Sequence, residues 1–502
     1  MLRLIARWSC AVCIFAGTLH LSAQGNEPIK LSVDWPAHAQ IMRTTPTLQV
    51  VVNPMLRRGT PVHDGAFTAL KSLGADYVRY VPWLPYPKLA VAELEPPTKD
   101  KTSWDFSLID PMTLDFLNAT EGHSRILNFS TIPAWLYVTP KRITYPGDPN
   151  QVDWNYTQGT VLRDPSCKEL ADYYARLVSW YTQGGFTDEL GVRHTSGYHY
   201  KIPYWEVFNE IDIEHHPTPE QYTRSYDAIV GRLHAINPQM KFVALALAFP
   251  ERNPEMFEYF LNHANHKPGI PLDMISYHFY ATPTPTQTVN DWQYTFFDQA
   301  QRLLAATRYI ESIRKRLSPE TRTTMDEIGS ILPTDWHPDK PNESGPAIPP
   351  IYWHTSGALY AYVFIESAKM GIDVVGESQL VGYPSQFPSV TMIDWTTGKP
   401  NARFEILRLI LDNVHSGDQM ATMRFSGEQI DALALRDASS SRLLLVNKRN
   451  REITISLPQK FSEGRISTVD MATDNAPNSA KQWHGSTLTL EPFAVVVVEA
   501  AR

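Results

Sequence analysis

The chain has 502 residues, of which 43% are apolar and 20% are charged, and these values exclude a wholly disordered or collagen-like protein. Its formal charge of −8 argues against a nucleic-acid partner, because domains that bind a nucleic-acid backbone are normally basic. After the first 25 residues, no stretch reaches the about 18 consecutive apolar residues of a membrane span.

The chain begins with a predicted leader over residues 1–25. Arg3 and Arg7 give it a positive start, an apolar stretch follows, and small residues lie near its end. We therefore expect an exported protein, secreted or periplasmic, without membrane contact once the leader is removed. Two of the three cysteines lie in the leader, and only Cys167 lies outside it. This residue is either a nucleophile or, more commonly for a lone cysteine, a small buried hydrophobic residue.

Residues 26–415 alternate between short apolar runs rich in β-branched residues and longer amphipathic stretches. Strand followed by helix, repeated, predicts parallel strands with crossover connections, and eight such units predict a (β/α)8 TIM barrel of class α/β. A doubly wound open sheet is the structural alternative, but no glycine-rich phosphate fingerprint follows the first run. The predicted strands cover 47–52, 77–81, 126–130, 205–208, 242–248, 274–280, 323–328 and 373–375, and helical patterns cover 168–182, 219–236, 254–265, 300–317 and 352–370.

Residues 416–502 have a different hydrophobic pattern. Alternating segments are separated by Gly, Asn, Ser and Asp turns, which predicts a small C-terminal antiparallel β-sandwich domain. Residues 26–46, which precede the first barrel strand, contain an alternating segment that is a candidate partner for this domain. The longest irregular stretch inside the barrel, 332–350, is rich in proline, and a loop of that length is usually a functional rim or lid.

Two glutamates lie at the carboxyl ends of predicted strands. The fourth run ends in Asn209-Glu210, and the seventh ends in an Asp-Glu-Ile-Gly motif that contains Glu327. The active site of such a barrel lies at the carboxyl ends of its strands, so these glutamates should face each other across the mouth. Two facing carboxyl groups suit glycosidic-bond hydrolysis, in which one protonates the leaving oxygen and the other attacks C1 or activates water. For either glutamate alone, a solvated loop position or a charge at the start of a helix is the alternative.

Three further polar residues lie within predicted strands. His278 and Tyr280 are two residues apart and so face the same way, and a tyrosine hydroxyl beside the cleft can hydrogen-bond the attacking carboxylate. Simple packing in the interior is the alternative for both. Arg79 lies within the second run, and an arginine that points into a barrel must be paired, with Glu327 as the expected partner. A one-residue change of register would point Arg79 outward instead.

These motifs resemble clan A of the retaining glycoside hydrolases and, within it, glycoside hydrolase family 39, the β-xylosidase and α-L-iduronidase group. The resemblance rests on Trp-Glu-Val-Phe-Asn-Glu at 205–210, Ser-Tyr-His-Phe-Tyr at 276–280 and Asp-Glu-Ile-Gly at 326–329. Segments 74–79, 131–135 and 394–400 add to it, and it covers most of residues 47–500.

Carried over position by position, the resemblance implies that Glu210 is the acid/base and Glu327 the nucleophile of a double displacement. It implies that Asn209 hydrogen-bonds the sugar 2-hydroxyl. The implied substrate is a carbohydrate, with β-xylosides among the candidates; no cofactor or metal is implied, and the oligomeric state is open. Supporting or substrate-binding roles fall to Arg79, His278, Tyr280 and Trp135.

The sequence departs from the family pattern at two places. Asp326 precedes the expected nucleophile where the family usually has an uncharged residue, and alternation along the strand predicts that only Glu327 faces in. The eighth run continues as Gly-Glu-Ser-Gln at 376–379, where a sugar-stacking tryptophan would be expected. Both departures concern which sugar is bound.

Two other functions fit some of the same residues. A metal hydrolase would use the loop after the fourth strand, but its ligand-type residues have neither helical i, i+4 histidine spacing nor contributions from several strands. A noncatalytic carbohydrate-binding barrel would use aromatic rings in loops after the strands, since sugar faces stack on such rings. The loop residues are Glu210, Asp212, Glu214, His215 and His216, and the aromatic residues are Trp83, Tyr86, Trp135, Trp154, Tyr156, Trp292 and Trp336.

Overall fold

The computed structural model describes residues 27–35, 40–154, 156, 159–335, 343 and 345–501. The expected leader lies outside these residues, as do Trp336 and the rest of 336–342 in the proline-rich loop. Among the described helices, none combines the length and the apolar character needed to cross a membrane.

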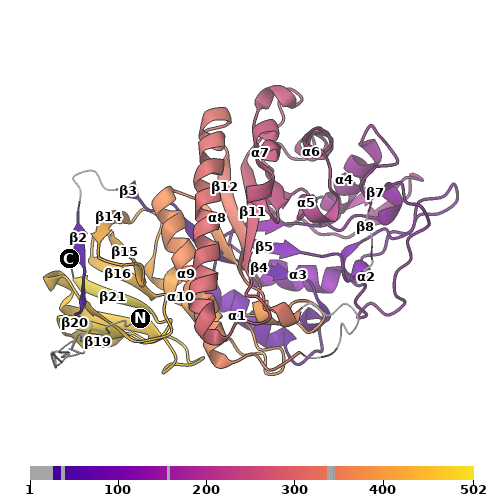
Figure 1. The fold of residues 1–502 in the computed structure, drawn as a ribbon. Helices are drawn as coiled ribbons and strands as arrows, with labels where there is room; N and C mark the ends of the chain where they lie inside the picture. Colours follow the sequence, from indigo (N-terminus) through magenta and orange to yellow (C-terminus); the bar gives the residue numbers. More distant parts are fainter. Residues whose placement is uncertain are drawn as a thin grey trace, which may run out of the picture.

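Eight parallel strands close into a barrel around which they follow one another in chain order (Figure 1). Each of the eight predicted runs overlaps one of these strands, so the predicted (β/α)8 barrel is confirmed and the open-sheet alternative is wrong. The strands are β4 (Thr45–Val51), β5 (Val78–Val81), β6 (Arg125–Leu127), β9 (Tyr204–Glu206), β10 (Lys241–Leu247), β11 (Met274–Ala281), β12 (Arg322–Ser330) and β13 (Val374–Glu377).

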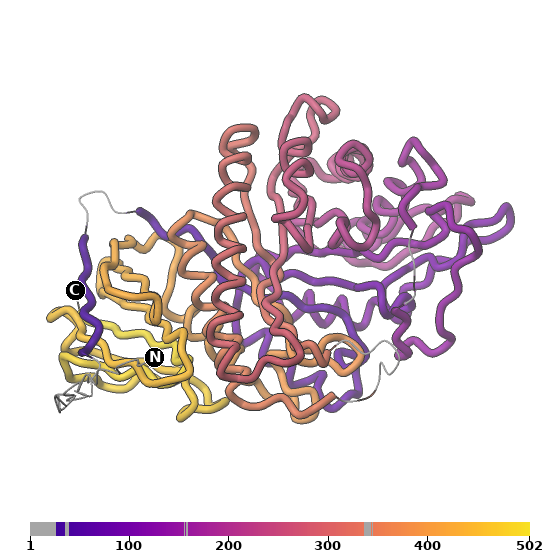
Figure 2. Tube along the Cα trace, in the orientation of Figure 1, coloured from indigo at the N-terminus to yellow at the C-terminus, as the bar shows by residue number. Residues whose placement is uncertain are grey.

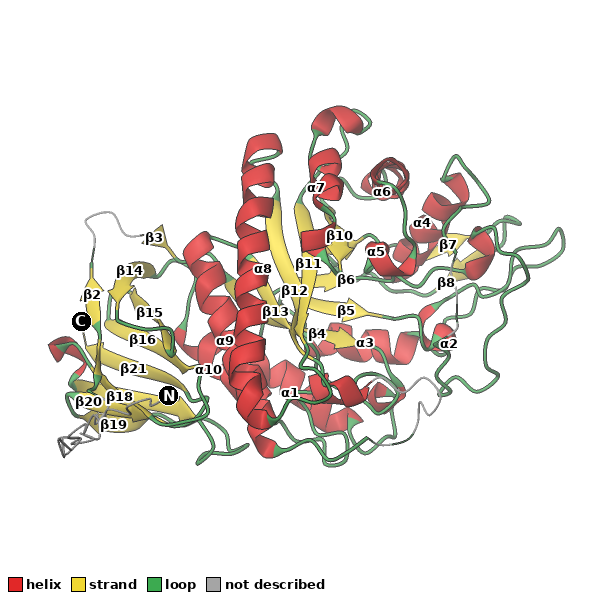
Figure 3. Cartoon of the chain, viewed as in Figure 1, coloured by secondary structure: helices red, strands yellow, loops and turns green. Residues whose placement is uncertain are grey.

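Helices surround the barrel strands (Figure 3). The five helical patterns correspond to α4, α6, α7, α8 and α9, and α8 begins earlier than predicted, because Thr288 and Asp291 form a capping box before its first turn. A two-stranded hairpin, β7 (Gly185–Thr187) and β8 (Arg193–Thr195), follows α4. The helices are α1 (His63–Leu73), α2 (Pro87–Ala90), α3 (Asp110–Ala119), α4 (Lys168–Thr182), α5 (Ile211–Glu214), α6 (Pro219–His234), α7 (Pro254–Phe260), α8 (Val289–Leu317), α9 (Pro350–Met370) and α10 (Ala402–Asn413).

The C-terminal part forms two sheets, as expected for a β-sandwich. The larger sheet has the order β19-β18-β21-β16-β15-β14-β2, with β3 also paired to β14, and the smaller has the order β1-β17-β20. Leu443, Ile455 and Val496 belong to one hydrophobic core shared by the two sheets. The strands are β1 (Ile29–Lys30), β2 (Ser32–Asp34), β3 (Gln40–Ile41), β14 (Gln419–Arg424), β15 (Ile430–Arg436), β16 (Ser440–Asn447), β17 (Ile453–Ser456), β18 (Glu463–Val469), β19 (Lys481–His484), β20 (Thr487–Leu490) and β21 (Val495–Ala501).

The segment before the barrel belongs to this sheet domain by its pairing. β2 pairs antiparallel with β14, and β1 pairs parallel with β17, so the indigo start of the described chain lies beside its orange and yellow end (Figure 2). Helix α9 contacts β15 and β16 and is apolar on nearly all sides, because the barrel covers one face and the sheet domain the other. Lys369 at the end of α9 lies 3.0 Å from Asp431 on β15.

Strand β12 contains a bulge that bears directly on the site. Ser276 of β11 pairs with Thr324, but His278 pairs with Glu327, so three steps along β12 match two steps along β11. The register to β13 shifts over the same part of β12. An extra residue in one strand breaks the alternation of side chains between its two faces.

Candidate active site

Glu210 lies directly after β9, at the carboxyl end of the fourth barrel strand. Its backbone has φ 39° and ψ 48°, a left-handed conformation that is unusual for a residue other than glycine, and helix α5 begins immediately after it. Backbone strain of this kind persists where the surrounding structure holds a side chain in a required place. The side chain is 11% exposed and lines a cavity above the barrel.

The Glu210 carboxyl group is biased towards its protonated form. Burial is the main cause that raises its pKa, and the charge of Glu327 adds to this effect. A hydrogen bond from His278 opposes the shift, with Nδ1 at 3.0 Å from Oε1 of Glu210. A protonated glutamate beside a second carboxylate is suited to donate a proton.

Glu327 is held at both carboxylate oxygens. Nη1 of Arg79 donates to its Oε1 at 2.5 Å, and the hydroxyl of Tyr280 donates to its Oε2 at 2.6 Å. The two donors fix the orientation of the Glu327 carboxyl group. The side chain is 9% exposed, so it remains open to the cavity from above. The predicted pairing of Arg79 with Glu327 is therefore confirmed.

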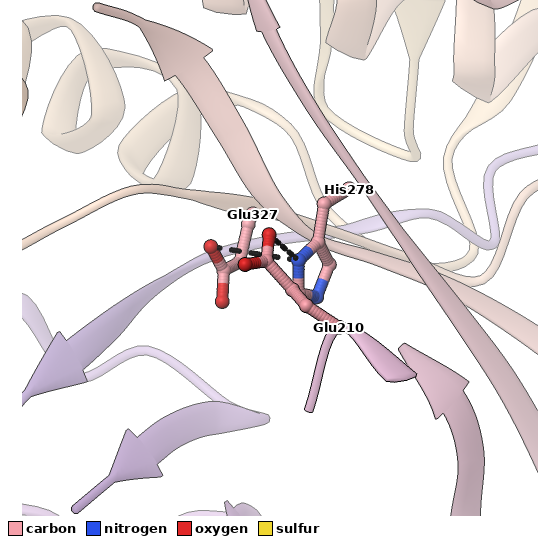
Figure 4. A group of neighbouring side chains, drawn as sticks. All are labelled: Glu210, His278 and Glu327. Atoms are coloured by element: carbon pink, nitrogen blue, oxygen red, sulfur yellow. Dashed lines mark hydrogen bonds and ion pairs between the residues drawn. The ribbon is translucent and has the colours of Figure 1, made fainter. Parts of the chain in front are cut away.

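His278 points one ring nitrogen, Nδ1, at both glutamates (Figure 4). Its Nδ1 is 3.0 Å from Glu210 and 3.5 Å from Glu327, and its Nε2 is 3.4 Å from Asp326. Burial lowers the pKa of His278, but the surrounding carboxylates outweigh burial and raise it well above its usual value. We therefore treat His278 as an imidazolium that bridges the carboxyl groups.

The side chain of Asp326 also faces the barrel interior, so the prediction that only Glu327 faces in is wrong, although Glu327 lines the cavity and Asp326 does not. Its Oδ1 accepts a hydrogen bond from Ser276 at 2.7 Å, and its Oδ2 lies 3.5 Å from Nε of Arg79. The bulge in β12 is the physical reason, because it brings two consecutive side chains to the same face. Burial opposes ionisation of Asp326, but Arg79 and His278 prevail and lower its pKa.

Arg79 is the buried centre of this polar network. Its guanidinium donates to Oε2 of Glu206 at 2.5 Å, to Oε1 of Gln49 at 2.9 Å and to Oδ1 of Asn209 at 2.7 Å, in addition to Glu327. The side chain has no exposed surface. Every donor-bearing nitrogen of Arg79 is thus engaged below the two glutamates, and the guanidinium supplies the positive charge that allows several carboxylates to be buried together.

The structure places six of the seven predicted site residues in this network and one outside it. Asn209 adjoins Glu210 and donates from Nδ2 to Oε1 of Glu214 at 2.8 Å. Trp135 does not line the cavity: its indole N–H donates to the carbonyl of Glu93, and its ring is covered by the guanidinium of Arg163 at 4.4 Å. Trp135 follows β6 along the chain, but its hydrogen bond and its cation–π contact are with Glu93 and Arg163 and not with the two glutamates.

A cavity of about 650 Å³ opens above the two glutamates. Trp83, Trp154 and Phe387 form an aromatic cluster on its wall, with ring centroids 5.4 to 6.2 Å apart. Its further lining includes Gln49, Asn209, Glu214, His216, Phe249, Tyr280 and Gln379. A cavity of this size with an aromatic wall and convergent polar groups accommodates a small sugar.

The loop that suggested a metal hydrolase does not gather its ligand-type residues around one point. Asp212 accepts from the backbone N–H groups of Ala248 and Phe249, both at 2.9 Å, and so caps the end of β10. His215 is buried with Nδ1 3.1 Å from the carbonyl oxygen of Gly159, and burial lowers its pKa to about 4. Glu210 instead meets His278 and Glu327, with one ligand-type atom from each within 4.8 Å of the others.

Known proteins resemble this chain in two ways. Residues 427–498 match the family described as D-apionate lactonase, C-terminal immunoglobulin-like domain, and this match includes none of the cavity residues. No curated protein matches the chain.

Solved structures resemble nearly the whole chain. A GH30 endoxylanase from Clostridium papyrosolvens C71 is 14% identical with a TM-score of 0.56, and the match covers 95% of this chain and all of that one. A glucosidase from Croceicoccus marinus is 14% identical with a TM-score of 0.58 over 95% of this chain and all of that one. A GH51 arabinofuranosidase from Xanthomonas axonopodis pv. citri is 11% identical with a TM-score of 0.63 over 94% and 99%. At these identities the likeness establishes the fold alone. Membership of glycoside hydrolase family 39 stays a prediction.

Sequence reasoning missed several residues of the network. Glu206 lies two residues before the end of an otherwise apolar run, and a charge there needs an interior partner just as Arg79 does, so the two could have been paired. Gln49 lies within β4 and Gln379 follows β13, and neither side chain was given a role. Glu214 was considered only as a metal ligand, yet it lines the cavity beside Asn209.

Proposed function

We propose that this protein is a retaining glycoside hydrolase. The observation that carries the proposal is the pair Glu210 and Glu327, at the ends of the fourth and seventh strands, with an oxygen of each within 4.8 Å of the other. Retaining enzymes have carboxyl groups about 5–5.5 Å apart, whereas inverting enzymes need about 6.5–9.5 Å to admit a water molecule. The short separation therefore supports double displacement.

Each step follows from the protonation states that the surroundings favour. Glu327, ionised and oriented by Arg79 and Tyr280, attacks the anomeric carbon while protonated Glu210 gives its proton to the departing glycosidic oxygen. The bond between C1 and that oxygen breaks as the bond between C1 and Glu327 forms. Glu210, now ionised, removes a proton from water, and the resulting hydroxide displaces Glu327 and leaves a sugar of retained configuration.

The charge lining the cavity supports an uncharged sugar as substrate. Glu327 lines it as a carboxylate, Glu210 and Glu214 are biased towards the neutral acid, and none of its described lining residues is lysine or arginine. Arg79 lies beneath with no exposed surface, and each of its three nitrogens hydrogen-bonds a protein acceptor, so it is not available to a sugar carboxylate or sulfate. A uronic acid would meet the Glu327 carboxylate without a lysine or arginine in the lining to pair with its own charge. We therefore propose that the substrate is a neutral pentoside or hexoside rather than a uronide, with β-xylosides as the first candidates.

The test compares variants of the two glutamates on glycosides with good and poor leaving groups. Glu210→Ala should lose activity about 100-fold or more on an alkyl glycoside while the first step with a nitrophenyl glycoside is largely spared, because nitrophenolate departs without a proton. Glu327→Ala should lose activity on both, and azide should restore turnover to a product of inverted configuration.

Exposed Glu220 on α6 provides a control, since Glu220→Ala removes a carboxylate outside the cavity and should leave activity unchanged. Sugar binding without turnover by the wild-type protein, unchanged in Glu210→Gln, would instead identify a noncatalytic carbohydrate-binding protein. Export is proposed from the predicted leader, and the N-terminal sequence of the mature protein recovered outside the cytoplasm would test it.

A further inference from the structure

Glu214 is a third carboxyl group in the cavity, one helical turn after Glu210. The backbone N–H of Glu214 donates to the carbonyl oxygen of Glu210 at 2.8 Å, so α5 places the two side chains on the same side. Both residues line the cavity. The mechanism described above uses Glu210 and leaves Glu214 without a role.

One oxygen of Glu214 is fully engaged and the other is not. Oε1 accepts from the indole N–H of Trp83 at 2.7 Å and from Nδ2 of Asn209 at 2.8 Å. Oε2 is buried, and no group in the described part of the chain makes a hydrogen bond to it. Buried polar atoms in folded proteins nearly always have a partner, so an unpartnered atom in a cavity wall points to a group that arrives from outside.

The protonation state of Glu214 determines which kind of group can hydrogen-bond to its Oε2. Burial and the nearby charge of Glu210 raise its pKa to about 8, so the carboxylic acid is the main form at neutral pH. Because Oε1 already receives two hydrogen bonds, the acid proton belongs on Oε2. Glu214 therefore presents an O–H donor without an acceptor, next to the amide of Asn209.

We propose that Glu214 is a specificity-determining residue whose carboxylic acid donates a hydrogen bond to one hydroxyl of the sugar bound against Asn209 and Trp83. This inference rests on the proposed glycosidase function and adds to it a residue that selects the sugar. A sugar hydroxyl supplies the missing acceptor, and a ring without that hydroxyl leaves the Glu214 O–H buried and unpaired. Sites built to hydrogen-bond a substrate hydroxyl discriminate strongly against analogues that lack it.

The experiment measures kcat/KM for a nitrophenyl glycoside and for its 2-, 3- and 4-monodeoxy analogues. For the wild-type enzyme, one analogue should be poorer than the parent by about 30-fold, the order expected for one lost hydrogen bond to a buried group. Glu214→Leu should lose about 30-fold on the parent but no more than about threefold on that same analogue, because the interaction is already absent. Glu214→Gln keeps an N–H donor and an acceptor and should stay within about threefold of wild type.

Further variants separate this role from a structural one. Glu214→Asp withdraws the acid group by one methylene and should reproduce the selectivity loss of Glu214→Leu, which keeps the test valid if Glu214→Leu does not fold. Ile213→Val reshapes the neighbouring cavity residue and should leave the ratio of parent to analogue unchanged. Equal losses on every glycoside would overturn the proposal for Glu214 alone, whereas no turnover of any glycoside by wild type would overturn the glycosidase function as well.

Discussion

Arg79 and Glu327 join the second and seventh strands of the barrel across its interior, with Nη1 2.5 Å from Oε1. The side chain of Arg79 has no exposed surface, whereas that of Glu327 is 9% exposed. The guanidinium therefore fixes from below a carboxylate that remains open to the cavity above. The same guanidinium binds Glu206 and lies close to Asp326, so one cation serves three acidic groups.

Arg79→Met should destabilise the fold and abolish turnover. The substitution keeps much of the side-chain volume but leaves buried carboxylates without their cation, and breaking a buried ion pair typically reduces stability by about 3–5 kcal/mol. Arg79→Lys keeps the charge without the forked geometry and should lie between Arg79→Met and wild type. Urea unfolding and kcat on a nitrophenyl glycoside are the measurements, and an unchanged unfolding midpoint in Arg79→Met would contradict this account.

Tyr280→Phe should lower the rate of the first chemical step by about 10-fold to 100-fold with little effect on stability. It removes the hydroxyl that donates to Oε2 of Glu327 at 2.6 Å and so loosens the attacking carboxylate. The burst phase with a dinitrophenyl glycoside measures this step. Exposed Tyr294 on α8 offers the matched control, because Tyr294→Phe removes a hydroxyl far from the site. Equal rates for both variants would show that Tyr280 does not orient Glu327.

His278→Gln should move the alkaline limb of the kcat/KM profile to higher pH. The proposed acid Glu210 must be protonated to act, so this limb follows its pKa. The hydrogen bond from His278 lowers the pKa of Glu210, and removal of the positive imidazolium lets that pKa rise. His123 lies just before β6, at the opposite end of the barrel, and His123→Gln should leave the profile unchanged. A limb that moved to lower pH would refute the assigned charge of His278.

The raised pKa of buried Glu93 predicts that the stability of the fold depends on pH, independently of catalysis. Burial and then the charge of Glu189 raise its pKa from 4.5 to about 8, so the folded state binds a proton more tightly than the unfolded state. The stabilisation from this proton is complete below pH 4.5 and is lost as pH rises to about 8. The free energy of unfolding of wild type should therefore fall relative to Glu93→Gln by up to about 1.4 kcal/mol per pH unit in this window. Urea unfolding at several pH values would measure the difference in free energy of unfolding between the two proteins. A difference that does not change with pH would contradict the prediction.

A chelator should leave glycosidase activity unchanged. The atoms of Glu210, His278 and Glu327 are close enough to hold a metal ion, but Arg79 and protonated His278 already supply positive charge at this point. Assays after dialysis against EDTA, with and without added divalent cations, make the comparison. Loss of activity that a metal ion restores would favour a metal hydrolase instead.

The two predicted strand-end glutamates illustrate what a sequence can reveal about a site. Glu210 and Glu327 were recognisable because apolar runs ended in acidic motifs, and parallel strands bring their carboxyl ends to one edge. Arg79 was recognisable because a charge within an apolar run requires a buried partner. Trp135 was misplaced, because the direction of a ring in a loop depends on packing that no local pattern records.

The sequence by itself determined the eight-stranded barrel and the pair of facing glutamates, because hydrophobic periodicity and strand order are written along the chain. Only the tertiary structure decided that Asp326 faces inward, since the bulge in β12 arises from the register of that strand with both its neighbours. It also decided that Glu214 reaches the cavity and shares Asn209 and Trp83, residues contributed by different loops. The protonation of Glu210 and Glu214 and the expected preference for an uncharged sugar likewise depend on groups distant in sequence, because burial and electrostatic interactions act through space.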